Sequence, residues 1–162
     1  MISKKTHALT TGAMIAALYV VFTYLAEMLG LSRMAIQLRF SEALTVLPIF
    51  TPAAVPGLFA GCLLANLLTG AALWDVLFGS LATLIGAFGT RMLRQYPVSA
   101  VCAPILSNTV IIPFVLRYAY GTTEALPYLF ATVFAGELLS CGVLGLLLYR
   151  LLKRWQKPLG FE

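Results

Sequence analysis

The sequence predicts an all-α integral membrane protein with six transmembrane helices, of which the second and third are short or broken. Two observations predict this fold class. Of the 162 residues, 60% are hydrophobic and only 10% are charged, whereas a soluble domain averages about 25% charged residues. The apolar residues also occur in segments of about 20, the length that an α-helix needs to cross a bilayer. Because no polar linker divides the chain, we expect residues 1–162 to form a single transmembrane domain.

Four apolar segments have the length of a complete membrane-spanning helix. Arg91 and Arg94 close the second of them, as basic residues do where a span meets the cytoplasm. The four predicted spans are residues 8–29, 73–94, 98–119 and 126–152.

Prolines interrupt the apolar stretch at residues 41–70. A single α-helix of this length would measure about 45 Å, which exceeds the thickness of a bilayer core. Pro48, Pro52 and Pro56 break it, because proline removes a backbone donor and clashes with the preceding turn. The sequence therefore predicts two short spans, at residues 41–51 and 54–70. Interrupted helices at membrane depth are tolerated where they line a cavity or are buried in protein.

The distribution of Lys and Arg predicts the orientation. With six spans and a cytoplasmic N-terminus, eight basic residues lie inside and three lie outside. A five-span topology with the N-terminus outside gives the same ratio, so this rule places only the C-terminus in the cytoplasm. The three outside are Arg33, Arg39 and Arg117; the eight inside are Lys4, Lys5, Arg91, Arg94, Arg150, Lys153, Arg154 and Lys157.

In the six-span topology, most polar residues of the spans fall on the outer side of the membrane. An ionisable group inside a membrane is by default a candidate functional residue. Because several such residues come from different helices and share one side, they predict a polar pocket that opens outward. They are Glu27, Arg39, Glu42, Asn66, Trp74 and Asp75 near the outer ends of spans, with Asn108 and Glu137 near mid-membrane.

Each of these residues also has a purely structural interpretation. Arg39 and Glu42 can form a local ion pair at the interface. Trp74 is typical of the interfacial aromatic belt, and Asp75 of a helix cap. Asn66 and Asn108 can join helices to one another. Glu137 is the hardest to explain structurally, because a carboxylate within the apolar segment FAGELLSCGVLG needs a partner or a proton.

The first span carries small residues at a spacing of four. Gly12 and Ala16 share one stripe of the helix, and Ala13 and Ala17 lie beside it. Small residues at this spacing let another helix approach closely, so we expect a docking surface here. The alternative is an alanine-rich helix without a docking function.

The sequence predicts neither a metal site nor a cofactor. Cys62, Cys102 and Cys141 lie in apolar segments without a CxxC spacing, and we interpret them as small apolar fillers. A GxxxxGK[ST] phosphate-binding loop is also absent from the sequence, so we do not expect this chain to hydrolyse ATP.

Two long stretches, IQLRFSEALTVLPIFTPAAVPGLFAGCLLANLLTG and LWDVLFGSLATLIGAF, resemble the QueT family. Its members are substrate-binding S-components of energy-coupling-factor (ECF) transporters for queuosine precursors. The resemblance implies six helices in a bacterial cell membrane, with both termini cytoplasmic. It implies a pocket near the outer face, covered by the loop at residues 30–38. It also implies that an AxxxA-like motif, here Ala13 to Ala17, contacts a shared transmembrane subunit energised by two ATPase subunits.

A queuosine precursor carries a 7-deazaguanine ring, which suggests roles for the polar and aromatic residues. One carboxylate, Glu137, can accept both hydrogen bonds of the N1–H and 2-amino edge. Asp75 or Glu42 can neutralise an aminomethyl arm, and an asparagine amide can donate to the ring carbonyl. Ring faces stack on aromatic side chains, for which we expect Trp74, Phe78 and Phe134. The choice among free base, aminomethyl or nitrile precursor and nucleoside stays open.

Other functions remain open. One is a stand-alone carrier coupled to protons or cations through Glu137. Another is an S-component for a different vitamin-like ligand. A membrane enzyme or a structural subunit is a further alternative, although the sequence shows no Ser-His-Asp, Cys-His or zinc constellation that would carry a reaction.

Overall fold

The computed structural model describes residues 4–31 and 36–155, which form helices joined by short connections, with no strand in these two ranges. The helices are α1 (Lys4–Met28), η2 (Phe40–Ile49), α2 (Ala54–Leu68), α3 (Leu73–Met92), α4 (Pro97–Ala119), α5 (Leu126–Glu137), η3 (Leu138–Leu144) and α6 (Gly145–Trp155). The all-α prediction is therefore confirmed. Part of the loop expected to cover the pocket, together with Arg33 and Lys157, lies outside the described residues.

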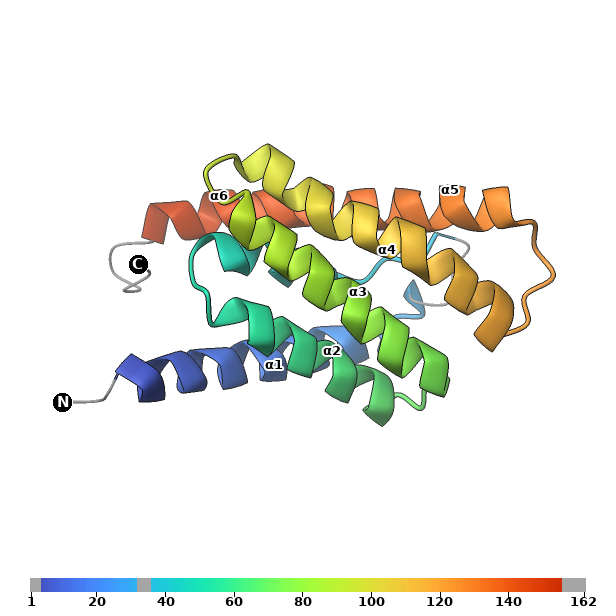
Figure 1. Cartoon of the computed structure of the whole chain (residues 1–162), viewed down its shortest axis with the longest axis horizontal. Helices are drawn as coiled ribbons and strands as arrows, with labels where there is room; N and C mark the ends of the chain where they lie inside the picture. Colours follow the sequence, from blue (N-terminus) through green and yellow to red (C-terminus); the bar gives the residue numbers. More distant parts are fainter. Residues whose placement is uncertain (1–3, 32–35, 156–162) are drawn as a thin grey trace.

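Successive segments run in opposite directions along the long axis of the molecule (Figure 1). The start of α1 and the end of α6 lie together at one end, which we call the terminal end. The ends of α1, α2 and α4 and the starts of α3 and α5 lie at the opposite end, which we call the distal end. An even number of antiparallel segments agrees with the six-span interpretation rather than the five-span one.

In the two described ranges, four helices are long and apolar enough to cross a membrane: α1, α3, α4 and the continuous helix Leu126–Trp155 that comprises α5, η3 and α6. These four predicted spans are confirmed to within a few residues. The remaining two, η2 and α2, have only 10 and 15 residues. At the rises of a 3₁₀- and an α-helix they measure about 20 and 22 Å, less than a bilayer core of about 30 Å. They are short, as predicted, and their role as full spans remains a prediction.

The short helix η2 forms the centre of the molecule. Every residue from Ser41 to Pro48 is buried, and η2 packs against α1, α2, α3, α4, η3 and α6. It is a 3₁₀-helix with Pro48 inside it, whereas 3₁₀ runs beyond three or four residues are uncommon. The sequence predicted a short helix here but not its 3₁₀ form, which is held by the surrounding helices.

Close approach between α1 and α2 depends on glycine. A Cβ atom at Gly57 would lie 2.6 Å from the carbonyl oxygen of Gly12, and one at Gly61 would lie 3.0 Å from the Cα of Ala16. Gly12 and Ala16, predicted for docking, therefore contact α2 of the same chain. Ala13 and Ala17, on the neighbouring stripe, are exposed.

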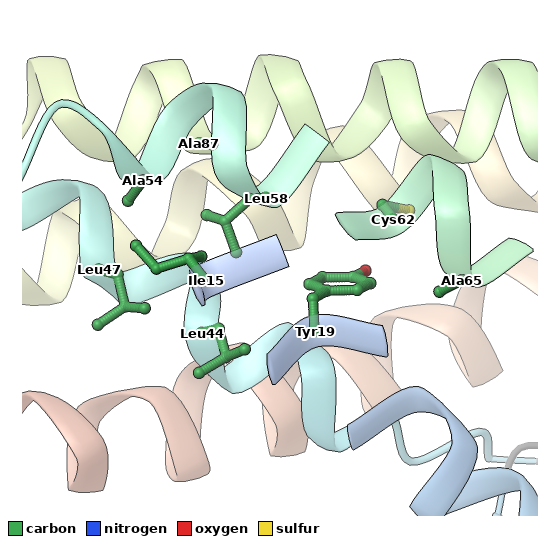
Figure 2. Close-up of a cluster of buried hydrophobic side chains, with 9 residues drawn as sticks. All are labelled: Ile15, Tyr19, Leu44, Leu47, Ala54, Leu58, Cys62, Ala65 and Ala87. Atoms are coloured by element: carbon green, nitrogen blue, oxygen red, sulfur yellow. The ribbon is translucent and has the colours of Figure 1, made fainter. Parts of the chain in front are cut away.

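The main apolar cluster joins α1, η2, α2 and α3 (Figure 2). The side chains of Ile15, Leu44 and Leu47 gather on one side of it, and the Tyr19 ring lies on the side of Cys62 and Ala65. The Tyr19 hydroxyl thereby reaches polar partners beyond the apolar cluster, as buried tyrosines usually require.

Arg91, near the end of α3, holds the last turn of η2. Its Nη1 atom donates to the carbonyl oxygens of Pro48 at 3.0 Å and Ile49 at 3.3 Å. The last carbonyls of a helix have no partner within the helix, so the guanidinium supplies donors that the backbone lacks.

We expect Arg91→Ala to lower the free energy of unfolding by about 1 kcal/mol, because these carbonyls would lose their donor. In thermal unfolding of the purified protein, Tm should fall by about 2–4 °C for a chain of this size. Arg94→Ala is the matched control, because Arg94 is an exposed neighbouring arginine. An equal decrease of Tm in both variants would show that Arg91 stabilises the protein only through its surface charge.

Candidate functional site

A cavity of about 410 Å³ opens among the helix ends of the distal end. Ligand pockets typically measure about 300–1,000 Å³. We call this the large cavity. It is lined by Tyr19, Thr23, Ala26 and Glu27 of α1; Gln37, Arg39 and Ser41; Asn66, Thr69, Gly70, Ala71 and Asp75; and Leu116, Tyr120 and Thr122.

Asp75, in the first turn of α3, is the most distinctive residue of the large cavity. Its Oδ2 atom accepts a hydrogen bond from the Tyr120 hydroxyl at 2.9 Å, and its carbonyl oxygen accepts one from Asn66 Nδ2 at 3.2 Å. The Oδ1 atom is buried and has no hydrogen-bond partner among the described residues. A buried acceptor without a donor is costly, so Oδ1 is available for a ligand.

A second, smaller cavity of about 220 Å³ adjoins the large one and shares four lining residues with it: Gln37, Arg39, Leu116 and Thr122. We call this the small cavity. Its other walls come from α4 and α5 and are largely apolar, with Glu137 as a buried carboxylate. The remaining lining residues are Ile112, Glu124, Tyr128, Leu129, Thr132 and Val133.

Gln37 and Arg39 line both cavities, and their segment is anchored to the helix that carries Glu137. A Cβ atom at Gly136 would lie 2.4 Å from the carbonyl oxygen of Gln37, so only glycine allows this contact. The Arg39 amide donates to Ser140 Oγ at 3.1 Å. The Arg39 guanidinium makes one hydrogen bond to the described residues, a long one of 3.4 Å to Gln37 Oε1. Most of its five donors therefore remain free for a ligand in either cavity.

A buried polar cluster lies behind the cavities. Glu42 accepts hydrogen bonds from the Tyr19 hydroxyl at 2.5 Å and from Asn108 Nδ2 at 3.5 Å. The Cys141 thiol donates to Glu137 Oε2 at 3.2 Å. The described side-chain hydrogen bonds of Glu42 come from α1 and α4, and Arg39 adds a charge interaction to them.

Glu42, Glu137 and Cys141 bring one potential metal-ligating atom each to within 4.8 Å of one another. The expectation that Cys141 is an apolar filler is thus wrong, because its thiol is a member of the polar cluster. Cys62 likewise accepts a hydrogen bond from Thr83 at 3.3 Å. Both carboxylates already have donors, so we interpret the three residues as a hydrogen-bonded cluster.

A π-helical turn shapes the last membrane helix at this point. The π-helix η3 begins directly after Glu137, and Glu137, Ser140 and Cys141 are all buried. One-turn π-bulges are rare and occur frequently at functional sites. Here the wider turn belongs to the part of the helix that contacts both Arg39 and Glu42.

The structure brings most of the predicted polar residues together. Asn66 and Asp75 line the large cavity, Glu137 lines the small one, and Arg39 lines both. Glu42 and Asn108 lie in the polar cluster behind them.

The predicted aromatic residues lie elsewhere. Trp74, Phe78 and Phe134 are 57%, 41% and 44% exposed and line neither cavity. The Trp74 and Phe78 rings instead stack on each other, with centroids 5.6 Å apart, beside an apolar groove between α3 and α4. The reason is helical geometry, because Asp75 and Gly79 face inward and their neighbours in sequence therefore face outward.

Sequence reasoning missed Tyr19, Gln37 and Tyr120. Tyr19 had a usable signal, because it continues the stripe of Gly12, Ile15 and Ala16 and a tyrosine among small residues needs a hydrogen-bond partner. Gln37 and Tyr120 lie outside the helices and gave no periodic signal.

The QueT transporter family matches residues 9–154 of the sequence, which is most of its length. The chain belongs to this family. The queuosine precursor transporter QueT of Lactococcus lactis subsp. cremoris (strain MG1363) is 35% identical over 86 residues. This similarity covers 52% of the chain and 50% of that relative, so it spans about half the length of each. No solved structure matches the chain. Membership of this transporter family and the long apolar helices show that the chain is a multi-pass membrane protein.

We expect Tyr19→Phe to lower the free energy of unfolding by about 1–3 kcal/mol, because the buried Glu42 carboxylate would lose a donor. Thermal unfolding would measure the change. Tyr24→Phe is the matched control: Tyr24 lies on the same helix as Tyr19, and the change removes an exposed hydrogen bond to the carbonyl oxygen of Leu68 in α2. If Tyr24→Phe destabilises as much as Tyr19→Phe, the contact with Glu42 contributes nothing specific.

Proposed function

We propose that this chain is the membrane-embedded substrate-binding subunit of an ECF transporter that takes up a queuosine precursor. The observation that carries the proposal is the family match over residues 9–154, in a chain whose distal end holds two adjoining cavities with buried carboxylates in their walls. The name of the Lactococcus relative supports the ligand class. In this proposal the distal end faces outward, and both termini are cytoplasmic in a bacterial cell membrane.

The small cavity has the chemistry to bind the 7-deazaguanine ring. Its apolar walls, which include Ile112, Leu129 and Val133, suit the faces of a flat ring. The Glu137 carboxylate can accept both donors of the N1–H and 2-amino edge. Arg39 has free donors for the ring carbonyl, a role that the sequence had suggested for an asparagine.

The large cavity suits the substituent at the 7 position of the ring. Its polar lining of Asp75, Asn66 and several hydroxyl groups matches an arm that bears amine or hydroxyl groups. A ligand extending through both cavities would pass Arg39, which lines both of them. Behind Glu137, the Cys141 thiol donates to its carboxylate and Asn108 donates to Glu42 within the polar cluster.

Binding by the purified chain tests the proposal. We expect isothermal titration to detect 7-aminomethyl-7-deazaguanine but not 7-deazaadenine, whose edge lacks the two adjacent donors. Glu137→Gln should weaken binding at least about tenfold, because an amide donor would then face a ligand donor in a buried site. Parental affinity in Glu137→Gln would show that Glu137 serves packing and that the ring binds elsewhere.

Energy for transport would come from partner subunits, a shared transmembrane subunit and two ATPases. Ala13 and Ala17 support this part of the proposal, because they are small, exposed and one turn apart on α1. The alternative is a carrier that couples transport to protons or cations by itself. Uptake into cells that lack the energising subunits would favour that alternative.

Replacing both Ala13 and Ala17 with Trp should prevent co-purification with the transmembrane partner, because a bulky side chain blocks close helix approach. Ligand binding by the isolated chain should persist. Ala131→Trp, at an exposed alanine on α5, is the control for bulk added to the membrane-facing surface. Assembly of the double variant at the level of this control would exclude the docking role.

A further inference from the structure

The two cavities and the polar cluster behind them contain more negative than positive groups. Glu42, Asp75 and Glu137 are 1%, 6% and 6% exposed, and among the described residues Arg39 is the one basic side chain that lines either cavity. Arg117 lies on the exposed side, where its Nη1 atom donates to the carbonyl oxygens of Thr122 and Glu124. Buried carboxylates that lack a counter-charge are costly at membrane depth.

The three buried carboxyl groups differ in how completely they are satisfied. Glu42 and Glu137 accept hydrogen bonds from Tyr19, Asn108 and Cys141 within the polar cluster. Within the described part of the chain, Asp75 receives a side-chain hydrogen bond on Oδ2 alone, and its buried Oδ1 has no hydrogen-bond partner. The nearest basic residue of the cavity, Arg39, gives its side-chain hydrogen bond to Gln37. Arg39 thus attracts the Asp75 carboxylate by its charge but donates no described hydrogen bond to it, so Asp75 keeps a free acceptor.

The surroundings of Asp75 hold this acceptor in place. Tyr120 donates to the other carboxylate oxygen, and Asn66 donates to the carbonyl oxygen of the same residue. Gly79, one turn further along α3, leaves room for Oδ1, because a Cβ atom there would lie only 2.9 Å from it. A carboxylate held in this way, at the wall of a 410 Å³ cavity, can bind a cationic donor without rearranging its neighbours.

We propose that the large cavity binds a protonated amine of the ligand against Asp75, so that the protein selects cationic queuosine precursors over neutral ones. This inference rests on the proposed function and specifies its substrate class. A 7-aminomethyl arm, or a substituted amine with further polar groups, carries the required charge and has room in the large cavity. A 7-cyano group has neither the charge nor a donor for Oδ1.

Comparison of matched ligands tests this selectivity. By titration, the parent protein should bind 7-aminomethyl-7-deazaguanine at least about tenfold more tightly than 7-cyano-7-deazaguanine, because a charged hydrogen bond is absent from the second complex. The N-acetylated aminomethyl compound keeps the arm but removes the charge, and it should bind as weakly as the cyano compound. If the parent protein binds the charged and the acetylated ligand with equal affinity, the inference is overturned by this measurement alone.

Two variants separate the roles of the carboxylates. Asp75→Asn should weaken binding of the aminomethyl ligand at least about tenfold and leave binding of the cyano ligand nearly unchanged, which also shows that the variant is folded. Glu137→Gln should weaken the binding of both ligands by the same factor, so that the ratio of their affinities is preserved, because Glu137 contacts the ring that both ligands share. An unchanged ligand ratio in Asp75→Asn would overturn the assignment to Asp75. If Asp75→Asn binds neither ligand, the test rests on the parent protein: equal affinity for the aminomethyl ligand and its acetylated form would overturn the inference, and weaker binding of the acetylated form would support it.

These outcomes distinguish the inference from the proposed function. If the parent protein binds none of the three 7-deazaguanine compounds, the proposed function itself fails. If it binds all three equally, the proposed function stands and the selection for cationic ligands is wrong.

Discussion

The structure depends on one constraint, which is that the backbone from Gln37 to Ile49 must find its hydrogen-bond partners inside the protein. Within a bilayer, irregular or short helical backbone is tolerated only where protein or a cavity surrounds it. Ser140 accepts from the Arg39 amide, and Arg91 donates to the carbonyls of Pro48 and Ile49. Between these anchors, η2 is enclosed by the other helices. Among the described residues, the other five segments therefore pack around η2, which cannot itself be exposed to lipid.

The same constraint creates the candidate site. Because Gln37 lies directly against Gly136, the segment before η2 is held against α5, where Gln37 and Arg39 line both cavities. Glu42, at the start of η2, reaches Tyr19 of α1 and Asn108 of α4. In such water-poor surroundings electrostatic interactions are strong, so each buried carboxylate has a large influence on which ligand can bind.

The central helix η2 also connects the two ends of the molecule. Its first turn holds Glu42, beside the cavities of the distal end, and its last turn is bound by Arg91 near the end of α3. Ala13 and Ala17 lie near the middle of α1, on its exposed face. The proposed ligand site and the proposed docking surface thus lie on different parts of the fold, as a binding subunit that works with a separate energising module requires.

The sequence by itself determined the fold class, the four long spans and the positions of the two short helices, because apolar length and proline act locally along the chain. It also singled out the polar residues that meet at the cavities, since a carboxylate or amide is conspicuous among apolar residues. Only the tertiary structure decided which face of each helix points toward the cavities and the protein interior. Trp74 faces away from the cavities while Asp75 lines one, and Gly12 packs inside while Ala13 is exposed. Neighbouring residues on a helix differ by about 100° in direction. In an apolar chain both faces of a helix look alike in sequence, so packing against other helices decides which residues form the site.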